Sequence, residues 1–440
     1  MKICSSLQFP SSSLVAVTIG CIFLLLACSP FTVSGTFDEK KGIDDTSQAL
    51  IENGEQELYL LRGEHYLVVN ATASVGEFHI QYAFPPDYVY QTPVLFELHN
   101  DSTAPVLSYR IENEENEPNK IMNFTIGPLA SGASVLIHFS VWVMIHNHDY
   151  SDLPRYVKLP KKWQLPQETR IWLSSTDVVQ ARNILIKHTS HQLEIGTTNL
   201  MTFAKRTVFF TKYHHYLRFV IQYYLGTYRR QDALTTLFRN GECPGRSHLE
   251  CALFRANHVP ARVILATPHY DFWYQVHCLV EFYCPGYGWI LSEVHDAKMA
   301  HEPKNQIIMR ICYPVDEDNT GQDYFFPKMS GVERWYWIDT SKVVPYYKDF
   351  VEGSKSNMFP EQNCTTAPET ATLVASLSKS IFSYYQHYLG MDLSGENLDH
   401  FNQAVSYQQQ GLQSFIDTKN PEGYLSFFMN AYQEYQHIQI

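Results

Sequence analysis

The chain has 440 residues, of which 45% are hydrophobic and 18% charged, a composition typical of a globular protein with room for two to three domains. Its 33 basic and 45 acidic side chains give a net charge of −12, and no basic cluster stands out. A nucleic-acid site needs a concentrated positive surface, so no nucleic acid is expected as a partner.

Residues 1–35 are predicted to be an export signal. Lys2 supplies a positive charge ahead of an apolar run, Leu14 to Ala27, that is too short for a comfortable membrane span. Small residues follow this run, as they do at signal cleavage sites. The mature chain is therefore expected outside the cytosol.

Two cleavage sites fit this signal. Leu25-Leu26-Ala27-Cys28 is similar to a bacterial lipoprotein box, and cleavage there would lipidate Cys28 and tether the chain to a membrane. Cleavage after Val33-Ser34-Gly35 would instead release a soluble protein. The expected location is thus secreted or lipid-anchored at the cell envelope, and an uncleaved anchor is a less favoured third alternative.

The next segment is predicted to be rich in β-strands. Residues 36–56 are polar and predict a tether, whereas residues 57–145 contain short β-type runs separated by turn signals. In the last run, from Ser134 to Ile145, alternate apolar side chains fall on one face. This pattern predicts a β-sandwich domain, and it contains no evident catalytic set.

Residues 146–169 are predicted to be a linker, because prolines and charges interrupt any regular pattern. His146, His148 and Asp149 lie there and are better explained as a polar loop than as a metal site. Helical spacing follows from Thr176 onward and again from Leu200 to Leu225.

A cysteine at the start of a helix is the first candidate for chemistry. Pro244 directly follows Cys243 and fits the first helical position, so Cys243 is predicted at the N-cap. Apolar residues then recur at helical spacing: Leu249, Ala252, Leu253 and Ala256. A helix N-terminus favours a thiolate over a thiol, which suits a nucleophile. Cys251, on the same helix, is instead predicted to be a small buried hydrophobe.

A β-hairpin downstream offers a base and an acid. Two alternating runs, Val276 to Tyr283 and Trp289 to Glu293, are joined by a Pro-Gly-Tyr-Gly turn. If Tyr283 faces Trp289, His277 becomes the diagonal neighbour of Glu293, whose carboxylate could fix the imidazole tautomer. Glu281 lies about 13 Å along the strand from His277 and is a poor candidate for that role.

The carboxy-terminal part is predicted to be helical. Trp335 to Ile338 is expected to be the last strand of the core, which we place at residues 170–340. Residues 341–440 then contain two amphipathic patterns, Thr370 to Leu389 and Leu398 to Phe415. These helices are expected to pack on the core or on a partner.

These motifs together resemble the transglutaminase-like superfamily. The Gly-x-Cys before a helix, the Arg-Ala-x-x-Val-Pro-Ala-Arg that ends at Arg262, the later His277 and the Pro-Gly-Tyr-Gly-Trp turn occur in that family's order. The resemblance covers about residues 170–315. It implies a papain-like core with Cys243 as nucleophile, His277 as base and Glu293 at the position where the family usually has Asp.

The predicted fold class is therefore α+β: an N-terminal β-sandwich, a transglutaminase-like core and C-terminal helices. The resemblance implies a cysteine enzyme that acts on carboxamide or peptide bonds of a protein or peptide through a thioester, with hydrolysis favoured over cross-linking. It implies no cofactor and no metal. The alternative is an inactive binding module with the same fold, and the oligomeric state is left open.

Two further expectations concern the cysteines and the oxyanion hole. Of the nine cysteines, Cys4, Cys21 and Cys28 belong to the signal or its edge, and a free Cys243 leaves an odd number, so no disulfide scaffold is predicted. The oxyanion hole is expected to use the amide of Cys243 and one more donor. Gln222, Tyr228 and other groups all remain open for that second donor.

Overall fold

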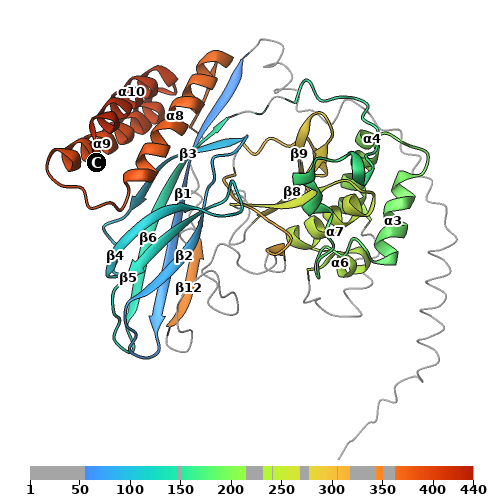
Figure 1. The fold of residues 1–440 in the computed structure, drawn as a ribbon, viewed down its shortest axis with the longest axis horizontal. Helices are drawn as coiled ribbons and strands as arrows, with labels where there is room; N and C mark the ends of the chain where they lie inside the picture. Colours follow the sequence, from blue (N-terminus) through green and yellow to red (C-terminus); the bar gives the residue numbers. More distant parts are fainter. Residues whose placement is uncertain are drawn as a thin grey trace, which may run out of the picture. The chain divides into compact units, whose positions relative to one another are not determined.

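The computed structural model (Figure 1) describes residues 55–146, 148, 150–214, 231–239, 241–267, 277–304, 306–317, 343–349 and 362–439. All of them fall within one compact unit, Asp45–Ile440. The predicted signal at 1–35, Cys28 and nearly all of the tether lie outside the described residues. Within the described part, no helix combines the length and the apolar character that crossing a bilayer requires.

Two antiparallel sheets are built from the amino-terminal segment. The first contains β1 (Gln56–Ala71), β6 (Ser134–His146) and β3 (Gln91–Leu98). The second contains β2 (Phe78–Phe84), β5 (Lys120–Ile126) and β4 (Val106–Asn113), of which β4 was not predicted. Aromatic side chains join the two sheets, since the ring of Phe139 on β6 lies 5.3 Å from that of Tyr82 and 5.5 Å from that of Phe124.

Two strands lie in residues 341–440, the region predicted to be helical, and the sequence patterns did not predict them. β12 (Val343–Asp349) and β13 (Gln362–Thr366) both pair antiparallel with β1. β1 is long enough to hold both of them along one edge, at different positions. Such a pairing joins residues almost 300 positions apart, and no local sequence pattern signals it.

The central part of the chain consists of helices packed on an antiparallel sheet. A sheet in the order β10-β9-β8-β7-β11 is formed by Lys298–Met299, Gly288–Glu293, His277–Cys284, Ala261–Ala266 and Ile308–Ile311. Helix α7 (Cys243–Ala256) packs against β7 and β8. Around α7 lie α3 (Ile184–Glu194), α4 (Leu200–Tyr213) and α6 (Ala233–Arg239). Two short 3-10 helices precede them: η1 (Lys162–Gln164) and η2 (Gln167–Leu173).

Two helices and one strand predicted for this central part differ from the structure or lie outside its described residues. The helix expected from Thr176 begins only at Ile184, because the side chain of Asn183 caps it by accepting the N–H of Leu185. The helix expected at Leu200 to Leu225 is α4, which ends at Tyr213, and residues 215–230 lie outside the described part. The expected strand at 335–338 also lies outside it.

Three carboxy-terminal helices pack together, the third against the other two, and the first two also contact amino-terminal strands. They are α8 (Pro368–Tyr388), α9 (Glu396–Thr418) and α10 (Pro421–His437), drawn in orange and red in Figure 1. Their amphipathic patterns predicted the first two, whereas α10 was not predicted. Tyr385 on α8 donates its hydroxyl to the carbonyl of Phe96 on β3 at 2.8 Å, and Phe382 stacks on Phe84. The helices therefore extend the amino-terminal core.

Candidate active site

Cys243 lies at the amino-terminal end of α7, one position further into the helix than predicted. Glu242 is the N-cap residue and Cys243 is the first helical residue. The helix still directs its free N–H groups and the positive end of its dipole toward this turn. The sulfur-bearing residue is 7% exposed, so it is nearly buried but not sealed.

Two glycines allow α6 and the residues just before it to approach this turn closely. A Cβ atom at Gly241 would lie 2.7 Å from Oγ1 of Thr236, and one at Gly245 would lie 2.6 Å from Oε1 of Gln231. Side chains at these positions would force the backbone apart. The amide oxygen of Gln231 also accepts the N–H of Glu242 at 3.1 Å. The first turn of α7 is thus fixed from outside the helix.

The hairpin has the predicted register, and it brings His277 and Glu293 together. Tyr283 pairs with Trp289 and Val280 pairs with Ser292 across β8 and β9. Nε2 of His277 lies 2.7 Å from Oε2 of Glu293, and both side chains are more than 90% buried. The other carboxylate oxygen accepts the backbone N–H of His295 at 2.9 Å. Glu293 is therefore held in one orientation and holds His277 in turn.

Glu281, the other acid on β8, belongs to a different network. Its carboxylate accepts Nε of Arg262 at 2.8 Å and the hydroxyl of Tyr88 at 2.8 Å. The guanidinium of Arg262 also lies 3.8 Å from the ring centroid of Trp289. This cluster is buried and joins the hairpin to the amino-terminal segment, so Glu281 is a structural residue.

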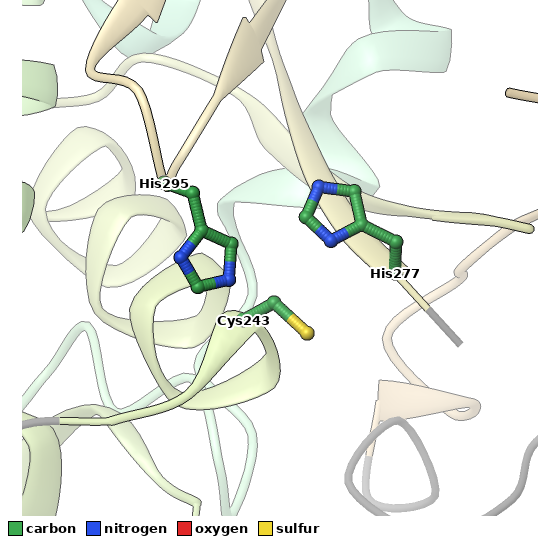
Figure 2. A group of neighbouring side chains, drawn as sticks. All are labelled: Cys243, His277 and His295. Carbon is green, nitrogen blue, oxygen red and sulfur yellow. The ribbon is translucent and has the colours of Figure 1, made fainter. Parts of the chain in front are cut away.

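The sulfur, the imidazole and a second histidine converge at one point (Figure 2). Ligand atoms of Cys243, His277 and His295 all lie within 4.8 Å of one another. Since Nε2 of His277 is engaged by Glu293, Nδ1 is the nitrogen left for the sulfur. Ser247, on the first turn of α7, donates its hydroxyl to the carbonyl of Cys278 at 3.1 Å and so ties the helix end to β8.

The charges of this cluster favour an ion pair between thiolate and imidazolium. The S–H of Cys278 lowers the pKa of the Cys243 thiol well below its usual value, and the neighbouring His277 and His295 add to this effect against the opposing effect of burial. Burial would lower the pKa of His277, but hydrogen bonds to Cys243 and Glu293 raise it to about 10.

Glu293 completes this balance of charges. Burial acts to raise its pKa, but the hydrogen bond and the positive charge of His277 lower it to about 2. The three groups therefore carry alternating charges, negative on sulfur, positive on His277 and negative on Glu293, over the pH range in which proteins normally work.

The remaining cysteines of the described residues are buried, and none of them forms a disulfide bond within the described part of the chain. Cys251 is fully buried in the core, and burial raises the pKa of its thiol well above the usual value, as expected for an inert cysteine. Cys278 differs from Cys251 in what its thiol contacts. It is fully buried, yet its thiol is a neighbour of Cys243 and is the largest influence on that sulfur's pKa.

The donor set of the cluster also suits a metal ion, because one thiolate and two imidazoles are ligands that Zn²⁺ prefers. Two further groups of potential ligands occur in the described residues: Glu64, His99 and His138, and His400, Glu434 and His437. The absence of a metal stays a prediction. Of the loop residues considered for a metal, Asp149 lies outside the described part, and His148 packs against the rings of Tyr90 and Tyr150.

Sequence reasoning missed two neighbours of the sulfur, Cys278 and His295, and the contact of Arg246 with His295. Cys278 directly follows His277 in the chain, and His295 follows Glu293 by two residues. These short distances along the chain were the only sign that Cys278 and His295 lie near the site. They do not show which side chains reach the sulfur until the hairpin is packed on α7. The two named candidates for an oxyanion donor, Gln222 and Tyr228, lie outside the described residues.

Comparison with known proteins gives one family. The model of the transglutaminase-like superfamily matches residues 204–294, the stretch that contains Cys243, His277 and Glu293. The chain is also similar to a solved structure from Cytophaga hutchinsonii described as a candidate cysteine protease, at 13% identity and a TM-score of 0.46, over 71% of this chain and 99% of that one. No curated protein sequence matches the chain significantly.

Proposed function

Since residues 204–294 place this chain in the transglutaminase-like superfamily, and its α+β fold class is as predicted, we propose that it is a cysteine hydrolase acting on carboxamide or peptide bonds. The observation that supports this best is the connected set of Cys243, His277 and Glu293. The sulfur and the imidazole converge at the start of α7, and the carboxylate lies 2.7 Å from the far ring nitrogen.

The proposed reaction has two halves. The thiolate of Cys243 attacks the carbonyl carbon, and the carbonyl oxygen becomes an oxyanion beside the amide groups of the helix N-terminus. His277 then gives its proton to the leaving nitrogen, the C–N bond breaks, and a thioester remains on the sulfur. In the second half, neutral His277 takes a proton from water, the hydroxide attacks the thioester, and Cys243 leaves as a thiolate.

Glu293 has a positioning role in this scheme. It holds the His277 ring through Nε2 and favours the imidazolium that exists before the first proton transfer and again after the second. The family usually has Asp at this position, and the longer Glu could in principle misplace the ring. Here the additional methylene is accommodated, because the carboxylate meets both His277 and the backbone N–H of His295 at hydrogen-bond distance.

Hydrolysis is proposed in preference to cross-linking for two reasons. The chain resembles the shorter bacterial-type members of the family more than the large calcium-dependent cross-linkers, and its sequence contains no EF-hand-type acidic loop. The expected substrate is a protein or peptide. Export through the segment at residues 1–35, with a lipid at Cys28 or without one, belongs to the same proposal.

The second candidate function is a binding module that has lost catalysis, for which the Glu at position 293 is the motivating observation. Labelling with iodoacetamide at pH 6 separates the two functions. An enzyme should be alkylated at Cys243 quickly, and His277→Ala should abolish the fast reaction, whereas Cys251→Ala should leave it unchanged. A slow, His277-independent reaction of Cys243 would favour the binding module.

A second experiment divides hydrolysis from transfer. A glutamine-containing peptide is incubated with the protein, with and without a primary amine, and the products are weighed. Hydrolysis converts the carboxamide to a carboxylate or cuts the peptide, and the amine leaves the product unchanged. A product that carries the amine as the main species would overturn the hydrolase assignment in favour of a transferase.

A further inference from the structure

His295 is a titratable neighbour of Cys243 that the proposed mechanism leaves without a role. It follows β9 and is anchored by its backbone N–H, which donates to Glu293 at 2.9 Å. Its ring stacks on that of His277 with centroids 5.5 Å apart and planes inclined by 20°. Figure 2 shows the two imidazoles on either side of the Cys243 side chain in that view.

Arg246 selects the tautomer of this second imidazole. Its guanidinium NH1 lies 3.0 Å from Nδ1 of His295, and its Nε is fixed by the carbonyl of Gly241 at 3.0 Å. A guanidinium has no lone pair to offer and can only donate, so Nδ1 of His295 must accept. The ring proton of His295 therefore sits on Nε2, which makes that nitrogen a donor.

A donor at this place has one chemical use. A ring nitrogen of His295 lies within 4.8 Å of the Cys243 sulfur. The hydrogen bond between the two side chains lowers the pKa of Cys243 and so stabilises its thiolate. His277 cannot replace it, because the proton of His277 is transferred during each half of the reaction. A neutral N–H that stays in place stabilises the sulfur anion at every stage at which it is free.

We propose that His295 is a positioning residue that donates Nε2–H to the sulfur of Cys243, in a tautomer set by Arg246, and so maintains the thiolate independently of His277. This rests on the proposed function only in taking Cys243 as the nucleophile. The family's nucleophile, base and acid are accounted for without it, so His295 is an addition to that set.

The test reads the thiolate directly and needs no turnover. The rate of iodoacetamide reaction at Cys243 is measured from pH 4 to 9 in the full chain with EDTA present. The groups that face the sulfur are Cys278 and His277 from β8, His295 after β9 and His248 from α7, and Arg246 from α7 faces His295. His295→Leu is expected to move the midpoint of the profile upward by about one pH unit, which corresponds to about a ten-fold slower reaction at pH values below the native midpoint.

Two further variants keep the proposal falsifiable if His295→Leu disturbs packing. His295→Gln retains an uncharged N–H donor and should recover at least part of the shift, while Arg246→Met should produce part of it by releasing the tautomer. Arg246→Lys retains a donor and should stay near the native midpoint. Thermal melting confirms that each variant folds.

The contrary outcomes are specific. An unchanged midpoint in His295→Leu, or equal shifts in His295→Leu and His295→Gln, would overturn the donor role. A shift of the native profile on adding EDTA would assign the three ligands to a bound metal and overturn it as well. Failure of the proposed function is distinguishable, because a protein that turns over no peptide can still show the His295-dependent midpoint.

Discussion

Two regions of the molecule each place two stacked histidines beside a carboxylate, yet only one has the properties of a reactive site. In the candidate active site, His277 and His295 stack near Cys243 and Glu293. On the first amino-terminal sheet, His99 and His138 stack with centroids 4.0 Å apart beside Glu64. Proximity of imidazoles and acids is thus common to both regions.

The difference lies in what the imidazoles face. A thiolate and a buried carboxylate raise the pKa of His277 to about 10 despite its burial. Burial, followed by the neighbouring His138, lowers the pKa of His99. In the described structure, Nε2 of His138 is buried without a hydrogen-bond partner, whereas Nδ1 meets Asp101 at 2.7 Å. A nucleophile at a helix N-terminus therefore distinguishes the candidate site from a buried histidine pair.

The largest expected effect comes from removing the sulfur or the base. Cys243→Ala and His277→Ala should each reduce kcat/KM for the peptide substrate by about 10³-fold or more, because each removes the nucleophile or its proton transfer. His138→Ala, in the other histidine pair, should leave kcat/KM unchanged. A comparable loss in His138→Ala would show that the two regions are not functionally different.

A smaller effect is expected at the acid. Glu293→Gln keeps the size of the side chain but removes its charge, so the pKa of His277 should fall and kcat should drop about 10²- to 10⁴-fold. Glu293→Asp should retain part of the activity, since it keeps the charge and loses one methylene. Native activity in Glu293→Gln would contradict the positioning role of this carboxylate.

A further prediction concerns the second thiol. Cys278→Ala removes the S–H donor beside Cys243, so the pKa of Cys243 should rise and alkylation at pH values below the native midpoint should slow about three- to ten-fold. Cys251→Ala is the matched control, because that thiol is buried on the same helix away from the sulfur's neighbours. Equal alkylation rates in the two variants would contradict the effect of the Cys278 thiol on the pKa of Cys243.

The smallest effect is a difference in how stability depends on pH. The pKa of Glu293 is lowered from 4.5 to about 2, so its contribution is present above pH 4.5 and is lost as pH falls toward 2. The pKa of His277 is raised from 6.5 to about 10, so its contribution is present below pH 6.5 and is lost as pH rises toward 10. The free energy of unfolding should therefore differ most between the native chain and Glu293→Gln at pH 4.5 to 6.5.

In the other histidine pair, the contribution of His99 to stability should change with pH in the direction opposite to that of His277. The pKa of His99 is lowered from 6.5, so its contribution is present above pH 6.5 and is lost as pH falls. Denaturant titrations of His99→Asn and the native chain should differ more at pH 7.5 than at pH 5. Identical curves at both pH values would contradict the burial effect on His99.

Much of the candidate site follows from local patterns. The proline after Cys243 and the apolar spacing predict α7, although the helix begins one residue earlier than expected. The turn between Tyr283 and Trp289 sets the hairpin register, which in turn brings His277 and Glu293 together. Both inferences depend on chain neighbours, where geometry is fixed by short turns and periodicity.

Only the tertiary structure decided what surrounds this set. The pairing of β12 and β13 with β1, the packing of α8 on β3, the approach of His295 and Cys278 to the sulfur, and the contact of Arg246 with His295 all join segments that no local pattern connects. Residue type and spacing determine which helix and hairpin form. Which of their side chains meet depends on how the finished elements pack, because packing acts between surfaces that the linear chain does not place side by side.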